Sequence, residues 1–327
     1  MIVPQYWAEG RVQSTTPHGR QLTVCRWGWS DAGQAAAQAH ADARAQEAFE
    51  RIATGESLPR REPKRAYNGA AGVPIREEIV ARHGDCVISR NAYGARCLNT
   101  PDVLFVDVDF APPGAAGRLW GAALLAVVGG ACIGAVAKAL VPALVAAVLI
   151  FGMGLVRTRA RPRRGGRDLS APHEQMLARL ERFTRHHPDW HLRLYRTPAG
   201  FRVLAMHDVF NPSDAGVADC FRLLGADTVY ARMCRNQNCF RARLSAKPWR
   251  IGIAEHIRPR PGVWPVRPDR LQERQAWVMR YEQAARGFAA CEFIAALGDA
   301  SRTHPKALAV QELHDAQAGA ASGLPIA

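Results

Sequence analysis

Alternating apolar and polar positions predict short β-strands on both sides of one long apolar run. Near the N-terminus, residues 5–12 and 20–28 alternate in this way, and turn residues join them. An Ala-rich, weakly amphipathic helix is expected to follow from about Ser30. After a linker rich in Pro, Gly and basic residues, the pattern predicts a short helix over 75–82 and a β-hairpin over 86–99.

A strand over 103–110, VLFVDVDF, ends shortly before the apolar run. Because side chains alternate along a strand, Asp107 and Asp109 leave the same face near the strand's end. Beyond the run, the pattern predicts a helix at 172–186, strands at 192–196 and 201–207, a helix at 214–224 and a strand at 227–233. The order βαββαβ is typical of an α+β, ferredoxin-like (RRM-like or palm-like) fold with four antiparallel strands and two helices on one face.

The apolar run covers residues 119–156 and contains one charge, Lys138, and one proline, Pro142. One membrane span needs about 20 apolar residues, so the run is too long for one span and just long enough for two. We therefore expect a transmembrane helical hairpin inserted in the fold, with spans at about 119–137 and 139–156. A buried helical pair and a single long tilted helix are the alternatives.

Basic residues flank this run and suggest its orientation. Arg118 precedes it, and six arginines follow within Arg157–Arg167. Positive charge near the ends of spans stays in the cytoplasm, which predicts an inner-membrane protein whose soluble parts are both cytoplasmic. The same arginines are expected to attract anionic lipid headgroups of the bilayer. The N-terminus has no basic region followed by an apolar stretch, so no signal peptide is expected there.

These elements divide the chain into five parts. They are an N-terminal β-hairpin and Ala-rich helix (1–60), a helix, hairpin and first palm strand (61–117), the transmembrane hairpin (118–157), the rest of the palm-like domain (158–258), and a C-terminal part (259–327). The last part is expected to hold a Pro-rich connector, a helix from about Leu271 to Leu297 and a disordered tail from Gly319.

The net charge of +14 favours anionic partners, and the two aspartates suggest how one is held. Two carboxylates as close as those of Asp107 and Asp109 repel each other unless a cation lies between them. Mg²⁺ or Mn²⁺ suits such oxygen ligands and would hold the phosphates of a nucleotide beside them. The alternative is that arginines neutralise the two carboxylates in a structural ion network.

An apolar strand that ends in Asp-x-Asp and opens a βαββαβ unit resembles the palm of the archaeo-eukaryotic primase and primase-polymerase superfamily, and more loosely that of diguanylate cyclases. The turn Thr197-Pro198-Ala199-Gly200 resembles the Thr/Ser-Pro-x-Gly turn that many primase-polymerases place before a nucleotide-binding histidine. This chain has Arg202 where that histidine is expected, and Asp227 is a candidate for the third acidic residue by its order only. The resemblance covers about residues 103–250 and implies a metal-dependent, nucleotidyltransferase-like site.

A dense basic and aromatic segment, residues 240–250, supplies further candidate ligands. Alternation places Arg241 and Arg243 on one strand face, where forked guanidinium donors can hold phosphate or carboxylate oxygens. Trp249 can stack on a base, although a core or interface position is the more common one for tryptophan. The candidate substrate-binding residues are therefore Arg202, Arg241, Arg243 and Lys247.

The eight cysteines show no regular spacing and are expected to be reduced thiols. Cys234 and Cys239, with His256 downstream, give a weak hint of zinc, but structural zinc needs four ligands with closer pairing. We therefore expect buried or free thiols at these positions.

The leading hypothesis is a membrane protein whose cytosolic palm-like domain binds, and as an enzyme transfers, a nucleotide. Nucleic acid is the other candidate partner. Asp107 and Asp109 would ligate Mg²⁺ or Mn²⁺. The main alternative is a non-catalytic, membrane-anchored interaction module in which the acidic and basic residues form an internal ion network. A membrane glycosyltransferase that uses Asp-x-Asp for a nucleotide-sugar is a third possibility, against which the strand order argues.

Overall fold

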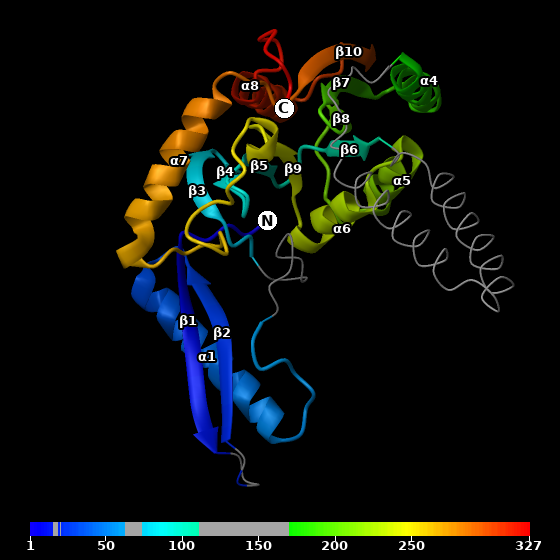
Figure 1. Ribbon diagram of the computed structural model, residues 1–327. Helices are drawn as coiled ribbons and strands as arrows, with labels where there is room; N and C mark the ends of the chain where they lie inside the picture. Colours follow the sequence, from blue (N-terminus) through cyan, green and yellow to red (C-terminus); the bar gives the residue numbers. More distant parts are fainter. Residues whose placement is uncertain (16–18, 20, 63–73, 111–169) are drawn as a thin grey trace, which may run out of the picture. The chain divides into compact units, whose positions relative to one another are not determined.

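The computed structural model describes residues 1–15, 19, 21–62, 74–110 and 170–327 (Figure 1). Its larger compact unit comprises residues 1–109 and 178–327, and the description below concerns this unit. The β-strands are β1 (Tyr6–Thr15), β2 (Gln21–Ser30), β3 (Glu78–His83), β4 (Cys86–Arg90), β5 (Arg96–Thr100), β6 (Phe105–Asp109), β7 (His191–Thr197), β8 (Gly200–Ala205), β9 (Phe240–Arg243) and β10 (Glu292–Gly298). The α-helices are α1 (Gln34–Ala53), α4 (Ser170–His186), α5 (Ala215–Leu224), α6 (Thr228–Gln237), α7 (Leu271–Ala285) and α8 (Pro305–Ala318).

The N-terminal strands and the first helix pack together through small residues. Strands β1 and β2 pair antiparallel from Tyr6 opposite Ser30 to Thr15 opposite Gln21. Helix α1 lies along them (Figure 1) and buries four alanines, among them Ala41. A Cβ at Gly10 or Gly28 would collide with the backbone of α1 at Ala41, so glycine allows the helix to approach the strands this closely. The Ala-rich composition of α1 thus reflects close packing on a sheet.

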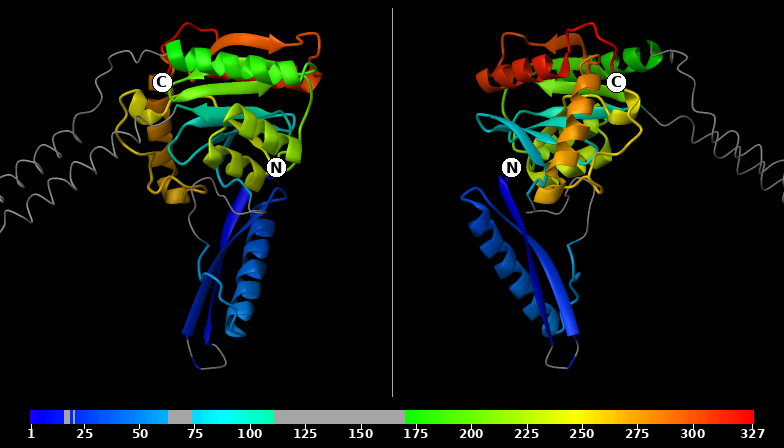
Figure 2. Two further views of the ribbon diagram at one scale, coloured as in Figure 1. Left: turned by 90° about the vertical axis from the view of Figure 1, so that its right-hand side faces the viewer. Right: turned by 60° about the vertical axis from the view of Figure 1, so that its left-hand side comes forward.

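The second sheet has the strand order β10-β7-β8-β6, and all its neighbours pair antiparallel. Residues 178–186 of α4 and helix α5 cover one face, and α8 covers the other (Figures 1 and 2). The apolar residues of β6 and β8 are buried between these layers, as expected for strands covered on both faces. Gly200 faces Asp109 across this sheet, where a Cβ would collide with the carbonyl oxygen of Val108.

The third sheet has the strand order β3-β4-β5-β9 and is also antiparallel. Helix α7 is anchored to the segment after β9 by Tyr281, whose hydroxyl lies 2.7 Å from Ser245 Oγ and donates to the carbonyl oxygen of Ala246 at 2.6 Å. Tyr281 and Trp277 form a buried cluster with Ile257. Because β9 also lies beside β6, the second and third sheets meet at these two strands.

The predicted four-stranded ferredoxin-like sheet is wrong. The segment 227–233, predicted as its fourth strand, belongs to helix α6, which Asp227 caps. Strand β10 instead extends the sheet beside β7, although it lies within the segment predicted as a helix up to Leu297. The described residues form a mixed α/β structure with three small sheets and six α-helices.

The expectation of a two-span inner-membrane protein is also corrected. Among the described helices, none combines the length and the apolar character that a bilayer crossing needs. Even α1, with 20 residues the longest of them, carries several charged side chains. The predicted spans, 119–137 and 139–156, and the Arg157–Arg167 cluster lie outside the described residues.

Other local predictions had mixed outcomes. The hairpins β4–β5 and β7–β8 confirm the predicted strand pairs and their turns. The predicted helix over 75–82 is wrong, because residues 78–83 form strand β3. The tail from Gly319 is ordered against the body of the unit: Ile326 bridges to Ala289, and the Ala327 amide donates to the Ala289 carbonyl oxygen at 3.0 Å.

Candidate functional site

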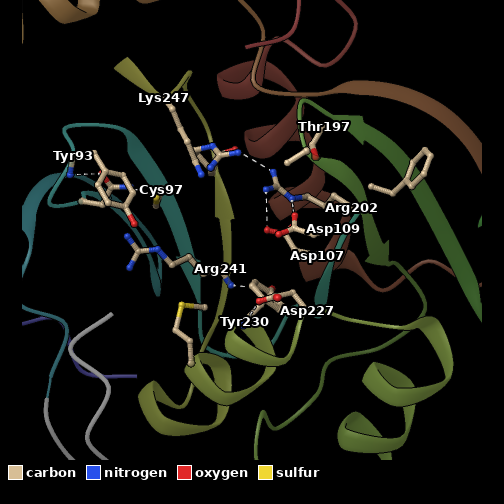
Figure 3. Close-up of a pocket in the computed structure, with 15 residues that line it drawn as sticks. Tyr93, Cys97, Asp107, Asp109, Thr197, Arg202, Asp227, Tyr230, Arg241 and Lys247 are labelled. Atoms are coloured by element: carbon tan, nitrogen blue, oxygen red, sulfur yellow. Dashed lines mark hydrogen bonds and ion pairs between the residues drawn. The ribbon is translucent and has the colours of Figure 1, made fainter. Parts of the chain in front are cut away.

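The six candidate metal-binding and substrate-binding residues of the sequence all line one cavity of about 140 Å³, where the second and third sheets meet (Figure 3). Its walls come from β5, β6, β7, β8, β9 and α6, with further residues from the β4–β5 turn and the segment after β9. The sequence candidates in the lining are Asp107, Asp109, Arg202, Arg241, Arg243 and Lys247. They are joined by several residues that the sequence did not single out for chemistry, including Tyr93, Cys97 and Tyr230.

Asp107 and Arg202 form an ion pair at one side of the cavity (Figure 3). They face each other across β6 and β8, and Arg202 Nε donates to Asp107 Oδ1 at 2.8 Å. Only 2% of the Arg202 side chain is exposed, and its Nη1 also donates to the carbonyl oxygen of Arg243 at 3.0 Å. Burial alone would lower the pKa of Arg202, but the Asp107 carboxylate raises it above its usual value. The Arg202 guanidinium is thus held by groups of the protein itself.

A buried histidine completes the surroundings of Arg202. His314 Nε2, on α8, lies 3.2 Å from Arg202 Nη1, and its Nδ1 lies 2.8 Å from Asp315 Oδ1. Because arginine only donates, Nε2 accepts and Nδ1 carries the proton that is donated to Asp315. Burial lowers the pKa of His314, which keeps this ring neutral. Helix α8 therefore fixes Arg202 from the side of the sheet opposite α5.

Arg241 forms the second buried ion pair of the cavity wall. Its Nη2 donates to Glu77 Oε2 at 2.6 Å, and 6% and 11% of the two side chains are exposed. The same carboxylate oxygen accepts a hydrogen bond from Ser89 Oγ at 2.6 Å. Arg202 and Arg241, here called the paired arginines, thus each have a carboxylate partner.

Two further carboxylates converge on the cavity beside Asp107. Asp227 caps α6 by accepting from the Tyr230 amide at 2.8 Å, and its own amide donates to the Asp107 carbonyl oxygen at 2.9 Å. Asp109 lies at the end of β6 and is only partly buried. Burial, followed by repulsion from Asp107 and Asp227, raises the pKa of Asp109, and two cations oppose this rise. Negative charge is therefore concentrated on this wall.

Arg243 and Lys247, here called the cavity cations, line the same cavity without an ion pair to any carboxylate of the described residues. Arg243 Nε is buried and has no hydrogen-bond partner in this part of the chain. Burial, followed by repulsion from Arg243 and Arg250, lowers the pKa of Lys247 to about 8. Burial and Arg243 likewise lower the pKa of Arg250 to about 10. The site thus holds crowded positive charge that an anion would stabilise.

The expectation of a metal-binding centre is corrected. Across the described residues, no three His, Cys, Asp or Glu side chains are grouped so that they could hold a metal ion. The physical reason lies in Asp107, whose carboxylate is engaged by Arg202 instead. Cys234 and Cys239 are buried free thiols, as expected, and burial raises the pKa of Cys239 to about 12.

Sequence reasoning missed Glu77, and it noted Asp227 only through its order in the chain. Glu77 is 164 residues from Arg241 and lies within the segment predicted as a helix, so no local pattern connects the two. For Asp227 a local signal existed, because Gly225 followed by Asp227 is typical of one helix ending and another beginning. A core or interface position was expected for Trp249, and the core position is wrong, because 53% of the residue is exposed.

No protein-family model, curated protein or solved structure matches the chain.

Proposed function

We propose that this cavity binds the phosphate groups of a nucleotide, with Arg243 and Lys247 as the direct contacts. The observation that carries the proposal is the pair of cavity cations, which share one cavity and lack carboxylate partners among the described residues. Guanidinium and ammonium groups both donate charge-assisted hydrogen bonds to phosphate oxygens. A bound phosphate would also relieve the repulsion between Lys247 and Arg243.

The paired arginines are left out of the proposed ligand set. Arg202 and Arg241 are buried and each forms an ion pair with a carboxylate, and removing the partner of a buried charge is costly. Their role in the proposal is to hold β6, β8 and β9 in place around the cavity. The proposal includes no resident Mg²⁺ or Mn²⁺. Titration in EDTA and then in Mg²⁺ shows whether a metal binds together with the nucleotide.

A second candidate function rests on the same two ion pairs. If all the charges of the cavity only stabilise the fold, the domain is a non-catalytic interaction module. The Asp107–Arg202 and Glu77–Arg241 pairs fit this alternative. The cavity cations do not, because an internal ion network would give them carboxylate partners.

The test is calorimetric titration of the purified full-length protein with inorganic tripolyphosphate and with ATP, in EDTA and then in Mg²⁺. Lys247→Gln removes one proposed contact and should weaken binding of both ligands about tenfold. The matched control is Arg267→Gln, which removes the same charge from an exposed site, where 79% of the side chain is accessible. Absence of binding by folded wild-type protein, or equal binding by Lys247→Gln, would favour the interaction module.

A further inference from the structure

The cavity is too small for a whole nucleotide. Its volume is about 140 Å³, whereas pockets that enclose drug-sized ligands measure roughly 300–1,000 Å³. Phosphate groups held by Arg243 and Lys247 would therefore leave the rest of the ligand outside the cavity. The residues beside its mouth decide which chemistry that remaining part can have.

An exposed aromatic side chain lies beside the cavity cations. Trp249 belongs to the short 3-10 helix Pro248–Arg250, directly after Lys247, and 53% of it is exposed. Lys247 Nζ lies 5.4 Å from the centre of the Trp249 ring. Tyr93, which lines the cavity, meets the same ring edge to face at 5.6 Å between centroids. Trp249 is thus adjacent to the cavity through two of its lining residues.

The backbone at Trp249 is held in place by its neighbours. The Arg250 amide donates to the Lys247 carbonyl oxygen at 2.9 Å, and Pro248 is buried. An exposed tryptophan ring leaves apolar surface in contact with water, which costs free energy. A planar base that stacks on the ring removes this surface from water and so recovers that free energy. Every nucleobase offers such a planar face, so stacking binds bases with little sequence preference.

From this juxtaposition we infer that Trp249 is a stacking platform for the base of a nucleotide whose phosphates occupy the cavity. The inference rests on the proposed function and adds the part of the ligand that the cavity does not hold. Lys247 serves both parts, since its ammonium lies beside the Trp249 ring and in the cavity lining. The ligand class is a nucleoside polyphosphate rather than an inorganic or sugar phosphate.

The experiment compares ATP with inorganic tripolyphosphate, which lacks the nucleoside, for the purified full-length protein in EDTA. Wild type should bind ATP about tenfold more tightly than tripolyphosphate. Trp249→Ala should abolish this preference and leave tripolyphosphate affinity unchanged, whereas Trp249→Phe should keep most of it. Tyr6→Ala, which truncates an exposed aromatic residue of β1, is the control and should change neither affinity.

The outcomes separate the two proposals. If neither ligand binds wild type, the proposed function fails, and the inference fails with it. If tripolyphosphate binds and ATP binds no more tightly, the cavity is a phosphate site and the stacking platform is overturned. A preference for ATP that survives in Trp249→Ala also overturns the platform, because the base then binds elsewhere.

Discussion

The cavity places two kinds of basic side chain within one small volume, and they differ in what surrounds them. The paired arginines, Arg202 and Arg241, are almost fully buried, and each donates to a carboxylate. The cavity cations, Arg243 and Lys247, have no such partner among the described residues. Arg241 and Arg243 are only two positions apart on β9, so their surroundings, and not their residue type, separate them.

This difference shows how charged residues that stabilise the fold can be told apart from those that are available to bind a ligand. A buried charge with a partner loses much stability when that partner is removed. A partly buried charge that lacks a partner does not stabilise the fold, and its field remains available to a ligand. The comparison therefore predicts large effects on unfolding at the paired arginines and effects on ligand affinity at the cavity cations.

The largest effect is expected from Glu77→Gln. Glutamine keeps an acceptor for Ser89 but leaves Arg241 buried without an opposite charge, which should lower the free energy of unfolding by about 3–5 kcal/mol. Denaturant unfolding followed by circular dichroism measures this change. Glu273→Gln, which breaks an exposed pair with Arg270, is the control and should cost no more than about 0.5 kcal/mol. Equal effects of the two variants would contradict the comparison.

Asp107→Asn should be the next largest. It removes the charge opposite Arg202, but Arg202 keeps His314 and the Arg243 carbonyl oxygen, and 31% of the Asp107 side chain is exposed. We therefore expect a loss of about 2 kcal/mol in the free energy of unfolding. Asp109→Asn on the same strand is the matched control, because no ion pair to a described residue involves Asp109. Its unfolding should change by less than about 0.5 kcal/mol.

Alternation along short strands was sufficient to predict much of this site. The pattern of residues 103–110 put Asp107 and Asp109 on one face, and both line the cavity. Arg241 and Arg243, predicted on one face of another strand, line it too. The sequence could not predict which basic residues are held by buried partners. Arg241 is held by Glu77 and Arg202 contacts His314, and both partners are distant in the chain and brought close only by folding.

The errors in the fold have local physical causes. Residues 228–233, TVYARM, contain β-branched and aromatic residues that favour a strand, but the Asp227 cap and tertiary packing make them helical. The segment Glu292–Gly298, EFIAALG, contains several helix-forming residues, yet it forms β10 because β7 offers an unpaired edge. In both cases tertiary contacts outweighed local propensity.

The cavity cations can be tested through pH. The pKa of Lys247 is about 8, lowered by burial, Arg243 and Arg250 and opposed by Asp109 and Asp107. A bound phosphate favours the protonated amine, so affinity is full below this pKa and falls as pH rises through it. Tripolyphosphate binding should weaken about tenfold from one pH unit below to about one unit above, with proton uptake on binding. Lys247→Arg should remove this dependence, because arginine stays charged; a persisting dependence would assign the titration to another group.

The smallest effect, from Asp109→Asn, has a sign that distinguishes two mechanisms. Asp109 lies near Arg243 and Lys247, and its carboxylate repels a bound phosphate. If these cations bind the phosphate directly, neutralising Asp109 should strengthen tripolyphosphate binding about threefold in EDTA. If Asp109 instead helps to hold a metal that bridges to the phosphate, the variant should weaken ATP binding, and only when Mg²⁺ or Mn²⁺ is present. Calorimetry of Asp109→Asn and of the charge-conserving variant Asp109→Glu separates the two mechanisms. Asp109→Glu should keep wild-type affinity only if the repulsion between a carboxylate and the phosphate is what matters.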